Sequence, residues 1–348
     1  MSITAAGTDT GTEAVALTKR DFTSDQEVRW CPGCGDYAIL AAVQAVIPEF
    51  ERKPQDVVFV SGIGCSSRFP YYMNTYGFHT IHGRAPAIAT GLAVSRPDLD
   101  VWVVTGDGDA LSIGGNHLIH ALRRNVDMTI LMFNNQIYGL TKGQYSPTSE
   151  AGKVTKSTPF GSVDHPFNPV SVALGAEATF VARTLDVDRP HLTEVLRRAH
   201  AHRGTSFVEI YQNCNIFNDN AFLTITSKDT KEDYQIRLKH GEPIRFGPEG
   251  SRGVRMGSGG NCEIVSVDDV GVDALLVHDE YADSPGLAFA LSRLAHGPSS
   301  PTPIGIFREV SRPTYGAGIT EQIEQATVAK GEGDLEALLR SADTWTIA

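Results

Sequence analysis

The chain has 348 residues and a mass of 37.5 kDa, the size of one large domain or two modest ones. Hydrophobic residues make up 41% and charged residues 20%, which is typical of a soluble globular protein and excludes collagen-like, coiled-coil and wholly disordered chains. The formal net charge of −11 argues against nucleic-acid binding, and no uncharged apolar run is long enough to span a membrane.

The N-terminal segment is rich in Thr, Ala and Gly and lacks the basic-then-apolar pattern of a secretion signal. We therefore expect a disordered tail over residues 1–20 and a cytoplasmic protein. In that compartment the five cysteines would not form a disulfide framework, and their odd number favours a metal site, catalysis or simple burial.

The following two hundred residues alternate between helical patterns and short apolar runs. Helices are expected over 36–49, 86–95, 115–124 and 191–203, and strands over 57–61, 101–106, 128–133 and 205–212. The apolar runs are continuous, as in parallel strands that are covered on both faces. The alternation predicts an α/β fold with a mainly parallel sheet flanked by helices.

Two further segments complete this organisation. Residues 139–169 are polar and rich in Gly, Pro, Ser and Thr, and a loop of this length inside a compact domain is usually functional. Beyond about residue 226 the pattern becomes less regular. We therefore expect a main domain over 21–230 and a C-terminal extension over 231–348.

Polar residues follow two neighbouring predicted strands. Gly106-Asp107-Gly108 ends one strand, and Asn134-Asn135 ends the next. Ligands bind at this edge of open α/β sheets, and glycines there let backbone amides approach a diphosphate. Carboxylate, amide and carbonyl oxygens suit Mg²⁺. A lone GDG is usually a plain turn, but the order strand–GDG–helix–strand–NN favours a diphosphate and magnesium site.

Four cysteines also fall next to predicted strands or in a tight loop. Cys31 and Cys34 form a CxxC pair, and Cys65 and Cys214 each follow a strand directly. Three interpretations compete: structural zinc, which prefers two CxxC pairs; buried thiols, which explains Cys262 well; and a [4Fe–4S] cluster on the first four. The cluster interpretation gains weight because the same sheet edge carries the GDG turn.

The two sets of motifs together resemble the β subunit of the 2-oxoacid:ferredoxin oxidoreductases. The resemblance covers about residues 22–230 and rests on CPGCG (31–35), SGIGCSSR (61–68), FHTIHGRA (78–85), GDGDALSIGGNH (106–117) and FNNQIYGLTKGQYSPTS (133–149). Within that family the chain is most similar to the 2-oxoglutarate enzymes. The resemblance implies the thiamine diphosphate-binding fold, specifically its diphosphate-binding domain.

The resemblance also implies an activity: thiamine-dependent oxidative decarboxylation of a 2-oxoacid to an acyl-CoA (succinyl-CoA for 2-oxoglutarate) with release of CO₂. Electrons would pass singly through the [4Fe–4S] cluster to ferredoxin. The implied ligands are Cys31, Cys34, Cys65 and Cys214 for the cluster, and Asp107, Asn135 and the carbonyl of Ile137 for Mg²⁺. Further cofactor contacts are implied for Gly106, Gly108, Asp109, Cys65, Ser66 and His82, although His82 is nearly as well explained as a core histidine.

The substrate end of the site follows from the same resemblance. A dicarboxylic 2-oxoacid needs a cation for its distal carboxylate, and a guanidinium can bind one in bidentate fashion. Arg68 is the first candidate, Lys142 the second, and Leu140 would form a wall of the pocket. A surface salt bridge is the alternative role for Arg68. Enzymes specific for pyruvate or branched-chain 2-oxoacids are the nearest alternatives for the whole protein.

Some parts of the expected machinery are not evident in the chain. In the family, the glutamate that activates thiamine diphosphate comes from the pyrimidine-binding domain of the α subunit. We therefore expect a chain that is inactive alone and forms an (αβ)₂ assembly, with no nucleic-acid or membrane partner. A non-redox thiamine decarboxylase subunit and a non-enzymatic cysteine-cluster scaffold remain as alternatives from other classes.

Overall fold

The computed structural model describes residues 17–295 and 300–347. Most of the predicted disordered tail, residues 1–16, therefore lies outside the described residues. The remainder is ordered: a 3-10 helix, Lys19–Phe22, places the side chain of Phe22 in the core.

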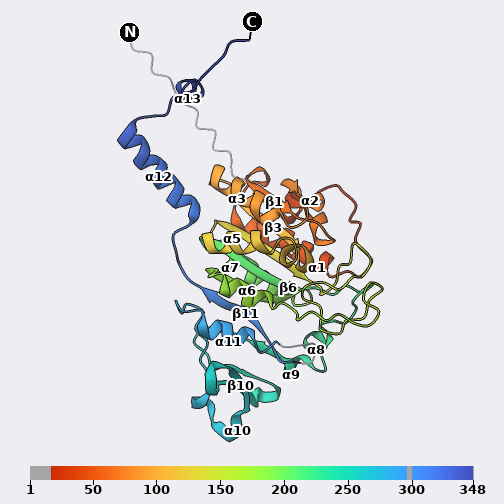
Figure 1. The fold of residues 1–348 in the computed structure, drawn as a ribbon. Helices are drawn as coiled ribbons and strands as arrows, with labels where there is room; N and C mark the ends of the chain where they lie inside the picture. The colour runs from red at the N-terminus through yellow and green to blue at the C-terminus, as the bar shows by residue number, and fades with distance from the viewer. Residues whose placement is uncertain (1–16, 296–299, 348) are drawn as a thin grey trace, which may run out of the picture.

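The centre of the molecule is a sheet of eight strands in the order β2-β1-β3-β4-β6-β5-β11-β7 (Figure 1). The first six in this order run parallel; β11 is antiparallel to β5, and β7 is parallel to β11. The strands are β1 Val57–Ser61, β2 Tyr76–His79, β3 Asp100–Gly106, β4 Met128–Asn134, β5 Phe180–Leu185, β6 Thr205–Tyr211, β7 Gln235–Arg237 and β11 Thr302–Glu309.

Helices cover both faces of this sheet. The larger helices are α1 Asp36–Val46, α3 Ala85–Ser95, α5 Gly115–Arg124, α6 Pro169–Gly175, α7 Arg189–Ala201 and α11 Gly286–Ser292; the short ones are α2 Phe69–Tyr72, α4 Asp107–Leu111, α8 Leu223–Thr226 and α9 Lys231–Tyr234. Successive strand residues point to opposite faces. Val58 and Val60 accordingly pack with α3, α5, α6 and α11, whereas Val57 and Phe59 pack with α1 and α7. The predicted α/β class is confirmed.

The main differences from the sequence prediction lie in the C-terminal third. Strands β7 and β11 belong to the central sheet although they lie in the predicted extension, 231–348. The boundary at residue 230 stays a prediction, but it does not separate two cores. In the middle of the chain, strand β5 was not predicted either. Its charged residue Arg183 looks exposed in the sequence, although the structure buries it as fully as Val181.

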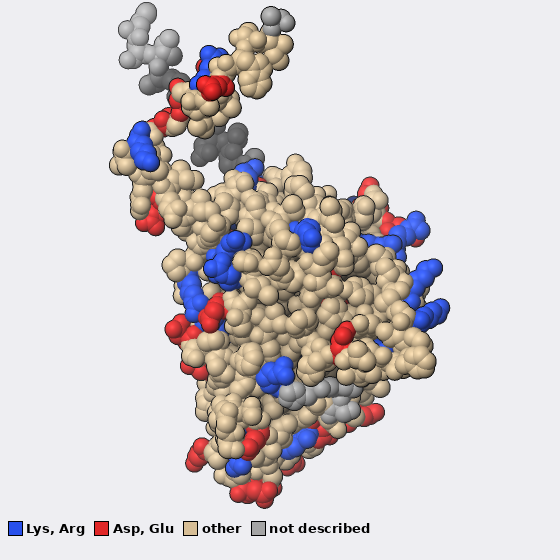
Figure 2. Space-filling view, viewed as in Figure 1, with Lys and Arg blue, Asp and Glu red and all other residues tan. Residues whose placement is uncertain are grey.

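Two smaller parts extend from this body. A three-stranded antiparallel sheet consists of β8 Arg245–Phe246, β9 Arg252–Met256 and β10 Cys262–Ser266, followed by α10 Val267–Val270. Both acidic and basic side chains are exposed at this end of the molecule, with acidic ones at its tip (Figure 2). The chain then ends in an arm, α12 Tyr315–Lys330 and α13 Leu335–Leu339, that runs away from the body (Figure 1). No helix among the described residues has both the length and the apolar character that crossing a membrane requires.

Candidate functional site

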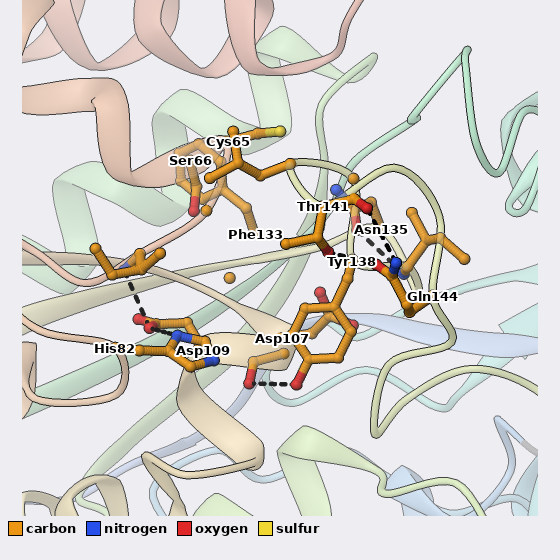
Figure 3. A pocket seen from close by; sticks show the side chains of 17 residues that line it. Cys65, Ser66, His82, Asp107, Asp109, Phe133, Asn135, Tyr138, Thr141 and Gln144 are labelled. Carbon is orange, nitrogen blue, oxygen red and sulfur yellow. Dashed lines mark hydrogen bonds and ion pairs between the residues drawn. The ribbon is translucent and has the colours of Figure 1, made fainter. Parts of the chain in front are cut away.

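A cavity of about 590 Å³ opens at the carboxyl edge of the parallel strands (Figure 3). The turns that follow β1, β2, β3 and β4 form it, as expected for an open α/β sheet. Its walls include nine of the residues singled out from the sequence: Cys65, Ser66, His82, Gly106, Asp107, Gly108, Asp109, Asn135 and Ile137. Four separate stretches of sequence therefore meet in one place.

Asp109 joins two of these turns. Its Oδ1 accepts the backbone N–H groups of Ile63 (3.0 Å) and Gly83 (2.7 Å) and lies 2.6 Å from Nδ1 of His82. Its Oδ2 accepts the hydroxyl of Thr105 at 2.6 Å. Asp109 lines the cavity as predicted, but its carboxylate is occupied by the loops around it, so its contribution is to hold the walls in place.

Asp107 begins helix α4 and is buried, with 2% of its surface exposed. The hydroxyls of Ser146 (2.5 Å) and Thr148 (2.6 Å) both donate to its Oδ2. Among the described side chains, none donates to Oδ1. Burial raises the pKa of Asp107 to about 6, and the two hydroxyls oppose that rise. A cation in the cavity would replace the lost hydration of this carboxylate.

Asn134 and Asn135 have different roles in the turn after β4. The side-chain amide of Asn134 donates to Glu209 at 2.7 Å, and its oxygen accepts the N–H of Gln136 at 3.1 Å, so this residue shapes the turn. Asn135 lines the cavity, and its oxygen accepts only the N–H of Ile137, at 3.2 Å. No donor in the described chain reaches the carbonyl of Ile137. Asn135 and Ile137 thus retain oxygen lone pairs, as magnesium ligands must.

Two features of the walls fit a bound diphosphate. Gly108 carries no side chain because a Cβ there would lie 2.3 Å from the ring of Tyr138, whose hydroxyl donates to the Gly108 carbonyl at 3.0 Å. The hydroxyl of Ser66 is buried in the cavity wall without a hydrogen-bond partner in the described chain. A buried unpaired hydroxyl is costly unless a ligand completes it. The residues present therefore fit the predicted cofactor.

The four predicted cluster cysteines come together beside this cavity. Cys65 follows β1 and Cys214 follows β6, and a Cβ on Gly139 would lie 3.5 Å and 3.6 Å from their two sulfurs. Cys34 lies in the loop before α1, where its N–H donates to the carbonyl of Cys31 at 3.1 Å. The remaining predicted bystander, Cys262, lies half-buried in β10 and packs against the core.

The surroundings of Cys65 and Cys34 raise the pKa values of these two thiols, as expected where a metal centre displaces the protons. Burial raises the pKa of Cys65 to about 12, with the negative charges of Asp36, Cys214 and Cys31 acting in the same direction and Arg68 opposing them. Burial raises the pKa of Cys34 as well. Thiols in such surroundings hold their protons until a metal centre displaces them.

The spacing of acidic and thiol side chains bears on the kind of metal centre. Across residues 17–295 and 300–347, no three His, Cys, Asp or Glu side chains lie close enough together to hold one metal ion. Structural zinc requires four such groups on one ion. In a [4Fe–4S] cluster each cysteine binds a different iron, so its thiols surround a larger cage.

Of the three predicted substrate residues, one lines the cavity and two do not. Leu140 lines the cavity, with 43% of its surface exposed. Arg68 and Lys142 do not line it: Nη1 of Arg68 donates to the carbonyl of Arg29 at 3.1 Å, and Lys142 stands exposed at a positive φ of 75°. Arg68 acts electrostatically on the wall residue Cys65, and Lys142 follows the wall residue Thr141 in the sequence, but neither cation lines the cavity.

Sequence reasoning missed several residues that shape the site. Ser146, Thr148 and Tyr138 lie in or beside the long polar segment, and Gln212 donates to Sγ of Cys34 at 3.4 Å. The only available signal was the clustering of hydroxyl residues in the sequence SPTS, 146–149, within a loop of unusual length. No periodicity connects that loop to Asp107, because the contact bridges about forty positions.

The fold and this cavity define a thiamine diphosphate-binding domain. In agreement, the family described as thiamine pyrophosphate enzyme, C-terminal TPP binding domain, matches residues 62–210. A 2-oxoglutarate oxidoreductase subunit KorB from Mycobacterium tuberculosis is 62% identical over 330 residues, which cover 94% of this chain and 88% of the relative. The chain belongs to the β subunits of the 2-oxoacid:ferredoxin oxidoreductases, and within them to those of the 2-oxoglutarate enzymes.

Two further comparisons support this assignment. The β subunit of 2-oxoacid:ferredoxin oxidoreductase 1 from Aeropyrum pernix is 47% identical over 190 residues, which are 55% of this chain and 60% of that subunit. A solved structure of 2-oxoglutarate:ferredoxin oxidoreductase from Magnetococcus marinus, with 2-oxoglutarate, coenzyme A and succinyl-CoA bound, superposes with a TM-score of 0.74 at 33% identity. That superposition covers 96% of this chain and 98% of the other. The predicted family is confirmed over the non-redox and scaffold alternatives.

Proposed function

We propose that this chain, together with an α subunit, oxidatively decarboxylates 2-oxoglutarate to succinyl-CoA and passes the electrons to ferredoxin. The observation that carries the proposal is the meeting of the GDG turn, the NN turn and four cysteines at one edge of one sheet. The substrate assignment rests on the similarity to the Magnetococcus marinus enzyme, which has 2-oxoglutarate, coenzyme A and succinyl-CoA bound.

The chain's own residues would hold the cofactors at fixed positions. Asp107, the Asn135 side chain and the Ile137 carbonyl would bind Mg²⁺, and Gly106, Gly108, Ser66 and His82 would line the diphosphate. When bound, thiamine diphosphate supplies the carbanion chemistry that no side chain can provide. The walls held by Asp109 keep the cavity in shape, and Tyr138 closes the side beside Gly108.

Cys31, Cys34, Cys65 and Cys214 would hold a [4Fe–4S] cluster directly beside the cavity. A cluster accepts one electron at a time, which is the chemistry that transfer to ferredoxin needs. Gln212 would contribute a hydrogen bond to Sγ of Cys34, and such bonds adjust cluster potentials. Because these cysteines must stay reduced, we place the assembly in the cytoplasm.

The substrate's distal carboxylate would meet a cation at the cavity mouth. Arg68 is our first candidate because its charge already acts on Cys65 in the cavity wall. Lys142, two residues after the wall residue Leu140, is the second. For Arg68 to act this way, its guanidinium must exchange the carbonyl of Arg29 for the substrate.

The cavity is chemically incomplete in a way that supports a partner subunit. Its acidic wall residues are Asp107 and Asp109; the first is assigned to magnesium and the second is taken up by the loops. The carboxylate that activates thiamine diphosphate would therefore come from the α subunit, in an (αβ)₂ assembly. Ferredoxins are usually acidic, so we expect docking away from the acidic tip of the part formed by β8–β10 and α10 (Figure 2).

The test is an assay of the co-expressed αβ complex, purified without oxygen. We expect a brown protein with about four iron atoms per β subunit. It should reduce ferredoxin when given both 2-oxoglutarate and coenzyme A, and should do so less efficiently with pyruvate. A colourless, iron-free complex that still turned over would contradict the redox mechanism.

Two cysteine variants make this test specific. Cys31→Ser should lose the cluster absorbance and ferredoxin reduction, whereas Cys262→Ser should retain both because Cys262 lies in β10 and packs against the core. Equal behaviour of the two variants would remove the assigned cluster.

A further inference from the structure

The segment Ser146-Pro147-Thr148-Ser149 touches both turns that would carry magnesium ligands. The hydroxyls of Ser146 and Thr148 donate to Oδ2 of Asp107 at 2.5 Å and 2.6 Å. The hydroxyl of Ser149 donates to the carbonyl of Gln136 at 2.6 Å and accepts the N–H of Ser146 at 2.7 Å. We refer to these three hydroxyls as the latch. It joins the GDG turn after β3 to the NN turn after β4.

The latch is buried and its bonds are directional. Ser146, Thr148 and Ser149 expose 2%, 3% and 4% of their surfaces, so water does not compete for their hydroxyls. Oxygen Oγ1 of Thr148 also lies 3.0 Å from Oδ1 of Asn134, but a hydroxyl has one proton, and the shorter bond to a carboxylate is the stronger. Both hydroxyls therefore act on a single oxygen of Asp107.

The consequence for Asp107 is geometric. Two donors hold Oδ2 and so restrict rotation of the carboxylate, while no described side chain donates to Oδ1. In the NN turn, the hydroxyl of Ser149 donates to the carbonyl of Gln136 and so fixes the peptide immediately before Ile137. The carbonyl of Ile137 itself has no donor among the described residues. The latch thus sets the distance and orientation between two proposed magnesium ligands that belong to different strands.

A buried ion pair within the sheet also holds the NN turn. Arg183 donates to Glu209 at 2.6 Å, with both side chains fully buried, and Glu209 accepts the amide of Asn134 at 2.7 Å. The NN turn is therefore held from the sheet by Glu209 and from the loop by Ser149, which leaves it little freedom to adapt.

We propose that Ser146, Thr148 and Ser149 are positioning residues for Mg²⁺-dependent binding of thiamine diphosphate. This rests on the proposed function and adds residues outside the GDG and NN motifs to it. Partners that orient metal ligands typically change metal affinity by roughly 10–100-fold when they are removed. A merely structural latch would instead change the stability of the protein and leave its dependence on Mg²⁺ unaltered.

The experiment uses the αβ complex, stripped of magnesium and thiamine diphosphate with a chelator. Binding of thiamine diphosphate is followed by calorimetry at increasing Mg²⁺, together with the melting temperature of the stripped complex. Thr148→Val, which keeps the shape and removes the hydroxyl, should raise the half-saturating Mg²⁺ concentration roughly 10–100-fold. Thr148→Ser should restore it, because it restores the hydroxyl.

The matched control is Thr158→Val, a change in the same loop. The hydroxyl that it removes donates to the carbonyl of Lys153 and not to Asp107. It should leave the Mg²⁺ dependence unchanged. If Thr148→Val also binds like the unaltered complex, the latch has no positioning role. If Thr148→Val fails to assemble, Ser146→Ala carries the same expectation. If the unaltered complex shows no Mg²⁺-dependent binding, the proposed function itself is wrong.

Discussion

The two ends of the central sheet are both polar and both buried, yet they differ in how their polar groups are satisfied. At the carboxyl end, Ser66 has an unpaired hydroxyl and Ile137 a carbonyl without a donor in the described chain. At the amino end, Asn125 is completely bonded. Its oxygen accepts from Thr205 (2.9 Å) and Thr179 (2.7 Å), and its amide donates to the carbonyls of Arg312 and Pro313.

This difference separates a binding site from a structural joint. The Asn125 network ties the start of β6 and the approach to β5 to residues 312–313, where the C-terminal arm begins. Polar groups that remain incomplete at the carboxyl end cost stability unless a ligand completes them. Ser66 therefore has a hydroxyl that a ligand in the cavity can complete, whereas the Asn125 network is complete without one; other buried atoms, such as Nε of Arg308, are also unpaired among the described residues.

The largest expected effect is at the functional end. Asp107→Asn keeps the size of the side chain and an oxygen for the latch but removes the charge that Mg²⁺ needs. As a direct ligand, it should cost more than the roughly 100-fold typical of outer partners, measured as ferredoxin reduction by the αβ complex. The melting temperature of the stripped complex should change little. A large loss of stability would instead make Asp107 part of the structural framework.

The structural end should respond in the opposite way. Asn125→Ala leaves buried donors without a partner and places alanine at a positive φ of 53°. We expect a loss of roughly 2–4 kcal/mol in the free energy of unfolding, measured by urea denaturation. The half-saturating Mg²⁺ concentration should stay unchanged. Weakened magnesium binding at full stability would erase the distinction between the two ends.

Arg68→Ala tests whether the cation at the cavity mouth recognises substrate. A lost charge-assisted hydrogen bond should lower kcat/KM for 2-oxoglutarate roughly tenfold or more. Pyruvate has no distal carboxylate, so its kcat/KM should be nearly unchanged. Equal losses for both substrates would reduce Arg68 to the structural role suggested by its bond to the Arg29 carbonyl.

The smallest effect concerns pH at the structural end. Burial lowers the pKa of His202 to about 4, and its Nε2 lies 2.8 Å from the hydroxyl of Thr179. The imidazole of His202 therefore takes up a proton more readily in the unfolded chain than in the folded one. As a result, the free energy of unfolding falls as the pH drops from about 6.5 to about 4. Because water reaches part of the ring, we expect about 1 kcal/mol.

The measurement compares urea denaturation at neutral and acidic pH for the unaltered protein and His202→Gln. The variant should lose less stability on acidification, because glutamine cannot take up a proton. An identical pH dependence of the two proteins would mean that other groups cause the acid destabilisation.

The sequence predicted some elements almost to the residue. Strand β1 matches the expected 57–61, and α5 matches 115–124. Both elements combine a clear hydrophobic pattern with glycine or asparagine at a boundary, which makes the local signal strong. The hydrophobic pattern failed for β5, where the buried Arg183 forms an ion pair with Glu209 on the neighbouring strand β6. A charged residue looks exposed until its partner is known.

The candidate site divides in the same way. Asp107, Asn135 and the four cysteines could be named from the sequence because their chemistry is concentrated in short motifs at strand ends. The roles of Ser146 and Thr148 depend on a loop that folds back across the sheet edge, and loop paths are not encoded in local periodicity. The same holds for Asp109: its contact with the diphosphate stays a prediction, and only the structure reveals that its carboxylate binds the surrounding loops.

By itself, then, the sequence determined the class of sheet, the family and the residue types able to hold magnesium, iron and diphosphate. Those properties depend on neighbours along the chain, such as apolar runs, glycine turns and a CxxC pair. Only the tertiary structure decided which oxygen of Asp107 the Ser146 and Thr148 hydroxyls bind, which asparagine shapes the turn, and that β7 and β11 complete the central sheet. These outcomes depend on contacts between distant segments, whose geometry is fixed only when the whole core packs.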